Sequence, residues 1–151
     1  MEEFVRLNLP IYKQKLKLIG EIQHIFDAVR KKYILLTKEE WVRQNFIHYL
    51  KNEKGYAFGL MNVEKTISYN NMKKRADIVI YNTTGTPFMI VECKSADVKI
   101  NKDVFYQICR YNYKLGVKYL VLTNGLDTFC CEINYKEKKI NLLSKIPNFN
   151  G

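Results

Sequence analysis

The chain has 151 residues, with 25 Lys and Arg against 15 Asp and Glu, so its formal net charge is +10. This length fits a single domain that can bury a core without staples, and 47% hydrophobic residues are ordinary for a soluble globular protein. No apolar run approaches the roughly 18 residues that cross a bilayer. The start lacks the features of a secretory signal, and without a Gly-Lys pair there is no phosphate-binding P-loop. We therefore expect a cytoplasmic protein with no membrane contact, no nucleotide cofactor and a polyanionic partner.

The cysteine pattern points away from zinc and from disulfides. No C-x-x-C occurs and the spacings match no zinc template. Two adjacent cysteines on a strand would point to opposite faces. We expect reduced and mostly buried thiols at Cys93, Cys109, Cys130 and Cys131.

The first firm element is a helix over residues 37–53. Thr37 and Glu40 have the spacing of a capping box at its start, and Gly55 is a candidate for its end. Before it, residues 1–36 indicate only short strands or a hairpin around Gly20, and we expect this segment to be an N-terminal extension packed on the core.

Three strand-like runs follow, over 60–69, 76–81 and 88–94. A second helix is expected over 103–115, ended by Gly116, with an apolar stripe at Val104, Ile108, Tyr111 and Leu115. A strand over 118–122 and a hairpin of 128–133 with 139–143 come next, and we expect a loose tail over 144–151. The predicted sheet is mixed: its first three strands form an antiparallel meander, and the fourth joins in parallel after the crossover helix.

Two acids stand inside these apolar strands. If the hairpin turns on Thr84-Gly85, Asp77 lies directly opposite Glu92, with Cβ atoms about 5 Å apart. Two like charges there are destabilising without a cation between them, because a buried carboxylate needs a partner. The plainer alternative is that Asp77 pairs with Arg75 or Lys74.

The residues around Glu92 suggest what the cation is. Glu92 and Lys94 share one face of the strand, and Cys93 points away, which leaves its backbone carbonyl near that face. Hard oxygens of this kind suit Mg²⁺, and a bound divalent ion makes a nucleophile of its water. Lys94 would orient or deprotonate that water, or stabilise the phosphate. The plainer alternative is a simple Glu92–Lys94 ion pair.

These motifs resemble the PD-(D/E)xK nucleases. Residues 75–79 and 91–94 look like the core of that superfamily, although Ala76 stands where the family has Pro, and Gln107-x3-Tyr111 resembles the additional element of some branches. Residues 39–44 and 119–125 further resemble the N-terminal nuclease domain of type I restriction enzyme R subunits. The resemblance covers roughly residues 37–133, and we assign the nuclease-like domain to 37–143.

The resemblance implies an α/β, restriction-endonuclease-like three-layer core with a mixed central sheet flanked by helices. Asp77 and Glu92, with the Cys93 carbonyl, would hold Mg²⁺ or Mn²⁺, and Lys94 would be the catalytic lysine. Gln107 and Tyr111 would face the site, with core packing as the alternative for Tyr111. Some related nucleases place a helix acid near the metal, which makes Glu40 a further candidate ligand, although its place in the capping box explains it already.

DNA is the expected substrate. Phosphate neutralisation gives affinity with little sequence information, and the residues that we expect to supply it are Arg43, Lys73, Lys74, Arg75, Arg110 and Lys114. Arg43 has two other readings, a carboxylate contact or a solvated helix face. The predicted function is Mg²⁺-dependent DNA cleavage, with a homodimer or other restriction-system subunits as partners. The alternative is a weakly active or inactive DNA-binding or regulatory module of the same fold.

Overall fold

The N-terminal region forms a small sheet of its own. The computed structural model describes residues 4–150, and the ends of the predicted extension and tail, residues 1–3 and 151, lie outside them. The sheet contains β1 (Leu16–Ile19), β2 (Ile22–Asp27) and β3 (Lys32–Leu35), all antiparallel in that order. Gly20 has a φ of +56° at the β1–β2 turn. The predicted hairpin is therefore confirmed, whereas β3 was not predicted.

Helix α1 (Lys38–Asn52) begins and ends where the sequence predicts. The Thr37 hydroxyl accepts a hydrogen bond from the Glu40 N–H at 3.0 Å, which satisfies one free donor of the first turn. After the last turn, Gly55 takes a φ of +82°, a conformation that favours glycine. The helix buries Val42, Phe46 and Leu50 at helical spacing.

The central sheet has six strands in the order β4-β5-β6-β7-β8-β9. A short 3₁₀ turn, η1 (Phe58–Leu60), leads into it. β6 and β7 run parallel and the other neighbouring pairs are antiparallel, so the predicted mixed sheet is confirmed. The strands are β4 (Met61–Tyr69), β5 (Met72–Tyr81), β6 (Pro87–Cys93), β7 (Tyr119–Thr123), β8 (Thr128–Asn134) and β9 (Lys139–Leu143).

The second helix, α2 (Lys102–Asn112), continues as a 3₁₀ turn, η2 (Tyr113–Leu115), up to Gly116. The predicted apolar stripe is wrong for most of its length, because the helix buries Phe105, Cys109 and Asn112 instead. Both faces of this helix carry apolar residues. The face with the large Phe105 ring is the buried one, where that ring stacks on Phe129 at 5.8 Å between centroids.

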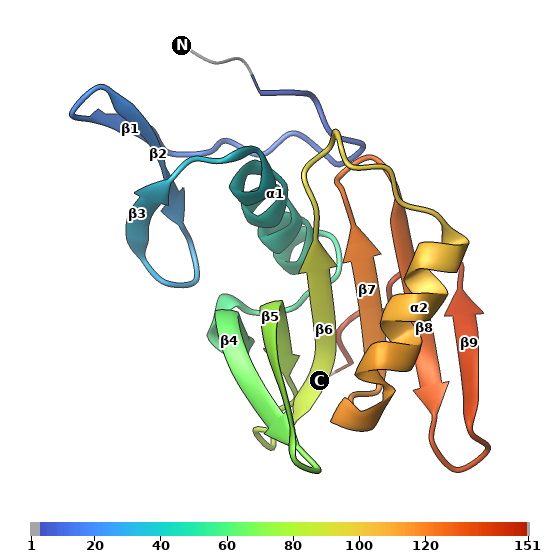
Figure 1. The fold of residues 1–151 in the computed structure, drawn as a ribbon. Helices are drawn as coiled ribbons and strands as arrows, with labels where there is room; N and C mark the ends of the chain where they lie inside the picture. The colour runs from blue at the N-terminus through green and yellow to red at the C-terminus, as the bar shows by residue number, and fades with distance from the viewer. Residues whose placement is uncertain (1–3, 151) are drawn as a thin grey trace.

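The molecule has three layers, with α1 on one face of the central sheet and α2 on the other (Figure 1). The core on the α1 side includes Phe46 and Cys130, and the core on the α2 side includes Phe105 and Cys131. The adjacent cysteines therefore point to opposite faces as predicted, and all four are free and buried. This arrangement confirms the predicted restriction-endonuclease-like architecture. No helix among residues 4–150 has the length and apolar character needed to span a membrane.

The predicted loose tail is wrong for the described residues 144–150. Ile146 is buried in the core on the α1 side. The Tyr56 hydroxyl donates to the Pro147 carbonyl at 2.7 Å, and the Phe149 N–H donates to the Lys54 carbonyl at the same distance. A terminal position and Pro147 indicate a loose segment, whereas these contacts with residues far away in the sequence hold the tail in place.

Because the tail is part of the core, Ile146→Ala is expected to lower the free energy of unfolding by about 2 kcal/mol, the lower end for such a truncation. Urea denaturation followed by circular dichroism measures the change. Leu142→Ala, which truncates a partly exposed side chain on β9, serves as the control and should cost clearly less. Equal losses in the two variants would contradict burial of the tail.

Candidate active site

Asp77 and Glu92 lie where the β5–β6 ladder ends. The last paired residues are Ile78 with Val91, in the register expected from the hairpin. One residue further, Asp77 Oδ2 accepts a hydrogen bond from the Cys93 N–H at 2.7 Å. The carboxylate of Asp77 thus replaces a backbone acceptor at the point where the two strands stop pairing.

The other oxygen of Asp77 is held by α1. Arg43 Nη2 donates to Asp77 Oδ1 at 3.0 Å. The plainer alternative, in which Asp77 pairs with Arg75 or Lys74, is therefore wrong, because the partner is Arg43. Arg43 is only 4% exposed, which makes it a carboxylate contact and corrects its assignment to a DNA-binding surface.

Arg43 gathers four carboxylates around one guanidinium. Besides Asp77, its nitrogens lie 3.2 Å from Glu39, 2.5 Å from Glu40 and 3.6 Å from Glu64. Although burial acts against the charged form, Glu40 and Asp77 raise the pKa of the Arg43 guanidinium. Arg43 is consequently a fixed internal cation at the base of the site.

Glu40 does not complete the capping box. Its backbone N–H is capped by Thr37, but its carboxylate accepts from Arg43 and, at 3.0 Å, from Gln44. The expected return contact to the start of the helix is replaced by these ion-pair and amide contacts. Burial raises the pKa of the Glu40 carboxyl, and Arg43 opposes that shift.

Glu92 faces two lysines. Lys74 Nζ lies 3.7 Å and Lys94 Nζ 3.9 Å from Glu92 Oε1. The ion pair between Glu92 and Lys94 is thus present. Lys94 remains half-exposed, so its ammonium is accessible to a ligand beside the two acids.

Helix α2 presents Tyr111 and Gln107 on its exposed side. Tyr111 is 63% exposed, so the core-packing alternative is wrong. Lys74 Nζ lies 5.6 Å from the centroid of the Tyr111 ring. Gln107 is exposed, and within residues 4–150 no hydrogen bond joins its side chain to Asp77, Glu92 or Lys94.

The acids fit Mg²⁺ in number and kind. Mg²⁺ is commonly held by one or two carboxylates, several waters and substrate oxygens. Asp77 and Glu92 are both about one fifth exposed, and both already attract cations. Residues 4–150 contain no cluster of three or more His, Cys, Asp or Glu side chains arranged to hold a metal. A metal held here would therefore rely on few protein ligands, and Asp77 and Glu92 are the candidate carboxylates.

The family model for the type I restriction enzyme R protein N terminus (HSDR_N) matches residues 38–147. The chain belongs to this family. A structure described as a fragment of a proposed HsdR subunit of a type I restriction enzyme from Vibrio vulnificus YJ016 is similar in fold, with a TM-score of 0.51 and 24% identity. The match covers 75% of the present chain and 24% of that one, so the chain spans about a quarter of its length. No curated protein matches the sequence.

Three polar residues that surround Arg43 or its acidic partners were not identified from the sequence as site residues: Asp27, Arg30 and Glu64. Glu64 lies on β4 between Val63 and Lys65, which pair with Ile78 and Ala76, so it stands opposite Asp77. Its register could have been found from Asn70-Asn71, a dipeptide suited to a tight hairpin turn. Asp27 and Arg30, which precede the family match, carried no such signal.

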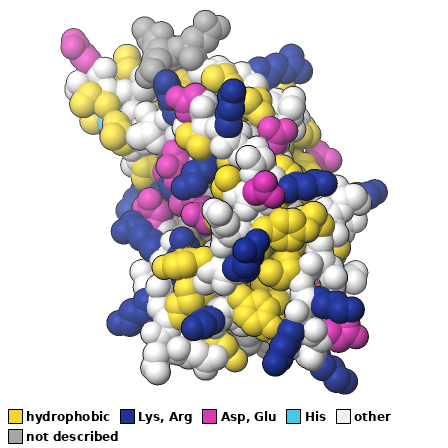
Figure 2. Space-filling view, turned by 45° about the vertical axis from the view of Figure 1, so that its right-hand side comes forward, with side chains coloured by type: hydrophobic (Ala, Val, Ile, Leu, Met, Phe, Trp, Pro, Cys, Tyr) yellow, Lys and Arg dark blue, Asp and Glu magenta, His cyan; other side chains and the backbone are white. Residues whose placement is uncertain are grey.

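The predicted DNA-binding residues other than Arg43 lie at or near the surface of the protein. Arg75 is 68% exposed and pairs with Glu64 at 3.1 Å. Arg110 and Lys114 are exposed along α2 and η2, and Lys73 is exposed on β5. Figure 2 shows acidic and basic side chains crowded on the flank between the small sheet and the β4–β5 hairpin, with Lys and Arg spread over the face below.

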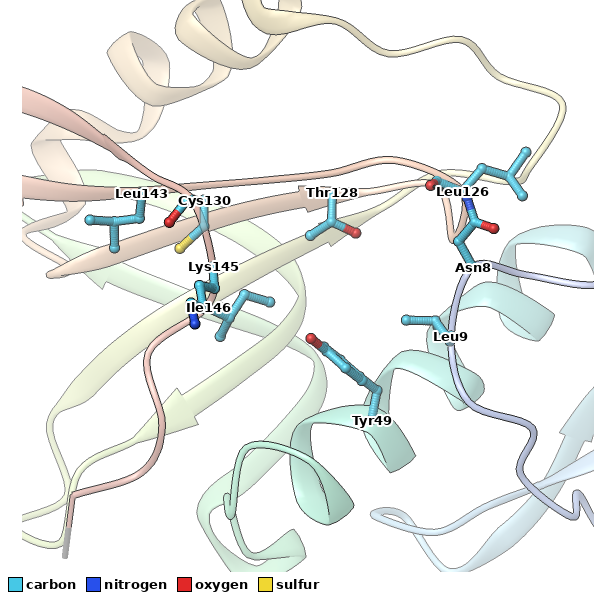
Figure 3. Close-up of a pocket in the computed structure, with 10 residues that line it drawn as sticks. Asn8, Leu9, Tyr49, Leu126, Thr128, Cys130, Leu143, Lys145 and Ile146 are labelled. Atoms are coloured by element: carbon cyan, nitrogen blue, oxygen red, sulfur yellow. Dashed lines mark hydrogen bonds between the residues drawn. The ribbon is translucent and has the colours of Figure 1, made fainter.

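A pocket of about 230 Å³ lies on the α1 side of the central sheet, and neither Asp77 nor Glu92 lines it. Tyr49 of α1 points into it toward the strands, opposite Thr128 and Cys130 (Figure 3). Burial raises the pKa of the Cys130 thiol to about 12, so this thiol is protonated and a poor nucleophile. The pocket contains none of the predicted site residues.

Proposed function

We propose that this domain is a Mg²⁺-dependent nuclease that hydrolyses DNA phosphodiester bonds. The observation that carries the proposal is the gathering of Asp77, Glu92 and Lys94 at the end of the β5–β6 ladder. Two acids beside a half-exposed lysine are suited to binding a metal and to contacting a phosphate. Membership of the R-protein N-terminal family supports the same function.

The chain would contribute binding, orientation and charge. Asp77, Glu92 and the Cys93 carbonyl would hold the ion, which when bound would lower the pKa of a water and supply the attacking nucleophile. Arg43 and the Cys93 N–H fix the two oxygens of Asp77. Lys94 would orient the water or stabilise the charge that develops on the phosphate. Lys74 would leave Glu92 for a DNA phosphate, with Tyr111 beside it.

The basic residues on β5 and α2 would hold the DNA backbone. Each contact between a cation and a phosphate releases counterions, so binding weakens with salt in proportion to the number of contacts. Arg110→Gln and Lys114→Gln are each expected to weaken DNA binding at all sequences and to lower the slope of log K against log salt by about one. Fluorescence anisotropy at several salt concentrations measures both effects. An unchanged slope in both variants would remove α2 from the DNA-binding surface.

Partners and compartment follow from the same function. Cutting both strands calls for two sites, so we propose a second copy or other restriction-system subunits as partners. A cytoplasmic location is consistent with four cysteines that are free and buried.

The direct test is incubation of the purified chain with circular and linear DNA, in Mg²⁺ and in EDTA. We expect cleavage only with the metal. Cleavage of both forms would indicate an endonuclease, and cleavage of the linear form alone would indicate an exonuclease. DNA that stays intact with Mg²⁺ and with Mn²⁺ would contradict the proposal.

The second candidate is a DNA-binding or regulatory module that does not cleave. It is favoured by the cations that already neutralise both acids, Arg43 on Asp77 and Lys74 with Lys94 on Glu92. DNA binding that is the same with and without Mg²⁺, together with no cleavage, would support this module over the nuclease.

A further inference from the structure

The turn between β2 and β3 holds one arginine rigidly. Asp27 is fully buried, and its Oδ1 accepts from the backbone N–H groups of Val29 and Arg30, each at 2.8 Å. Its Oδ2 accepts from Arg30 Nε at 2.6 Å. These contacts hold the guanidinium of Arg30 at Nε, which leaves its two outer nitrogens free to contact other elements.

The two outer nitrogens of Arg30 contact acids of the central domain. Arg30 Nη1 donates to Glu64 Oε2 on β4 at 3.2 Å, and Nη2 lies 3.6 Å from Glu40 Oε1 on α1. Both acids also flank Arg43, which in turn donates to Asp77. An unbroken series of contacts therefore leads from the small sheet to Asp77.

We propose that Arg30 is a positioning residue for Asp77, and that the β2–β3 turn is thereby a working part of the active site. The inference deepens the proposed function and rests on it, since it takes Asp77 as a metal ligand. The turn lies outside residues 38–147, the part that matches the family. The small sheet, which lies beside α1 in Figure 1, would then help to position Asp77.

The physical reason is a competition for Arg43. Although burial acts to raise the pKa of the Glu64 carboxyl, Arg43, Arg30 and Arg75 lower it, so Glu64 is held as a carboxylate. Without Arg30, both Glu64 and the buried Glu40 would have to rely more on Arg43. Arg43 would then shift away from Asp77, leaving that carboxylate fixed by the Cys93 N–H alone.

Charge and geometry can be separated by experiment. Removing a positive charge beside two acids should by itself tighten the binding of a divalent cation. If Asp77 is no longer held in position, the binding of the divalent cation should instead weaken. Lysine keeps the charge of Arg30 but cannot reproduce a rigid fork that reaches three carboxylates. Arg75 offers a matched control, because it contacts the same Glu64 oxygen from the exposed side of the cluster.

The test is Mn²⁺ binding to the full chain without DNA, followed by the electron paramagnetic resonance of the free ion. Arg30→Lys and Arg30→Gln are both expected to bind Mn²⁺ about tenfold more weakly, as outer partners of metal ligands commonly do when changed. Arg75→Gln is expected to bind it as tightly as the wild type or more tightly. In the same proteins without metal, the Cys93 amide should exchange with solvent faster in the two Arg30 variants only.

The outcomes distinguish the two proposals. Wild-type affinity together with an unchanged Cys93 amide in Arg30→Lys would overturn the positioning role and leave the nuclease proposal standing. A wild-type chain that binds no Mn²⁺ and cuts no DNA would overturn both. Circular dichroism at the temperature of the assay verifies that each variant is folded, so that a loss of affinity reports on the site.

Discussion

Asp77→Asn is expected to lower the rate of Mg²⁺-dependent DNA cleavage by at least about a thousandfold. A bound metal contributes several kcal/mol of charge stabilisation in the transition state, and each 1.36 kcal/mol corresponds to tenfold in rate. Asparagine has nearly the same shape and can still accept from the Cys93 N–H, the contact that Asp77 makes at 2.7 Å. The substitution therefore removes the charge with little change to the strand. Relaxation of supercoiled plasmid over time measures the rate.

Asp103→Asn is the matched control for that experiment. Asp103 is an exposed acid in the first turn of α2. The change in net charge is the same, so a general electrostatic effect on DNA binding would appear in both variants. We expect the control to cleave within about twofold of the wild-type rate, since surface substitutions have small effects. Similar rates in Asp77→Asn and the wild type would remove Asp77 from the active site.

Arg43→Met is expected to lower the free energy of unfolding by about 3–5 kcal/mol, the usual cost of removing one partner from a buried ion pair. Methionine fills much of the same volume, so the loss is mainly one of charge. The variant leaves Glu40 nearly buried and Asp77 partly buried without their shared cation. Urea denaturation measures the loss, and acid conditions should reduce it because burial raises the pKa of the Glu40 carboxyl, which becomes neutral on protonation.

A second substitution tests the cause of that loss. In Arg43→Met combined with Glu40→Gln, one of the uncompensated carboxylates becomes a neutral amide of similar shape. We expect this double variant to be more stable than Arg43→Met alone, with a coupling energy between the two substitutions of about 1–3 kcal/mol once the cost of Glu40→Gln in the wild type is subtracted. If the second change instead adds its own full cost, the stability of α1 depends on packing by Arg43 and not on charge.

The strands that carry Asp77 and Glu92 could be predicted because residues close together in the sequence determine them. Asp77 and Glu92 lie on β-branched neighbouring strands joined by one short loop, so the position of the loop predicts which residues face each other. The ladder shifts register between Ile80 and Tyr81, close to the loop, but it has the expected register at Ile78 and Val91. The start of α1 was equally accessible, since a capping residue such as Thr37 acts within one turn of the helix.

The partners of these acids could not be predicted, because they come from distant segments. Arg43 meets Asp77 across 34 residues, and Arg30 meets Glu64 across the same separation. An arginine on a helix has the same sequence pattern whether it faces solvent or a buried acid. The prediction of a loose tail was wrong for a related reason, since Ile146 and Phe149 pack against residues far away in the sequence.

The central claim is that Asp77 and Glu92 together hold the metal. A calorimetric Mg²⁺ titration of the wild-type chain and of Glu92→Gln, without DNA, tests it most directly. The claim predicts a binding isotherm for the wild type and binding at least about tenfold weaker for the variant, since it loses one of two carboxylate ligands. Identical isotherms for the two proteins, or no binding by the wild type, would contradict it.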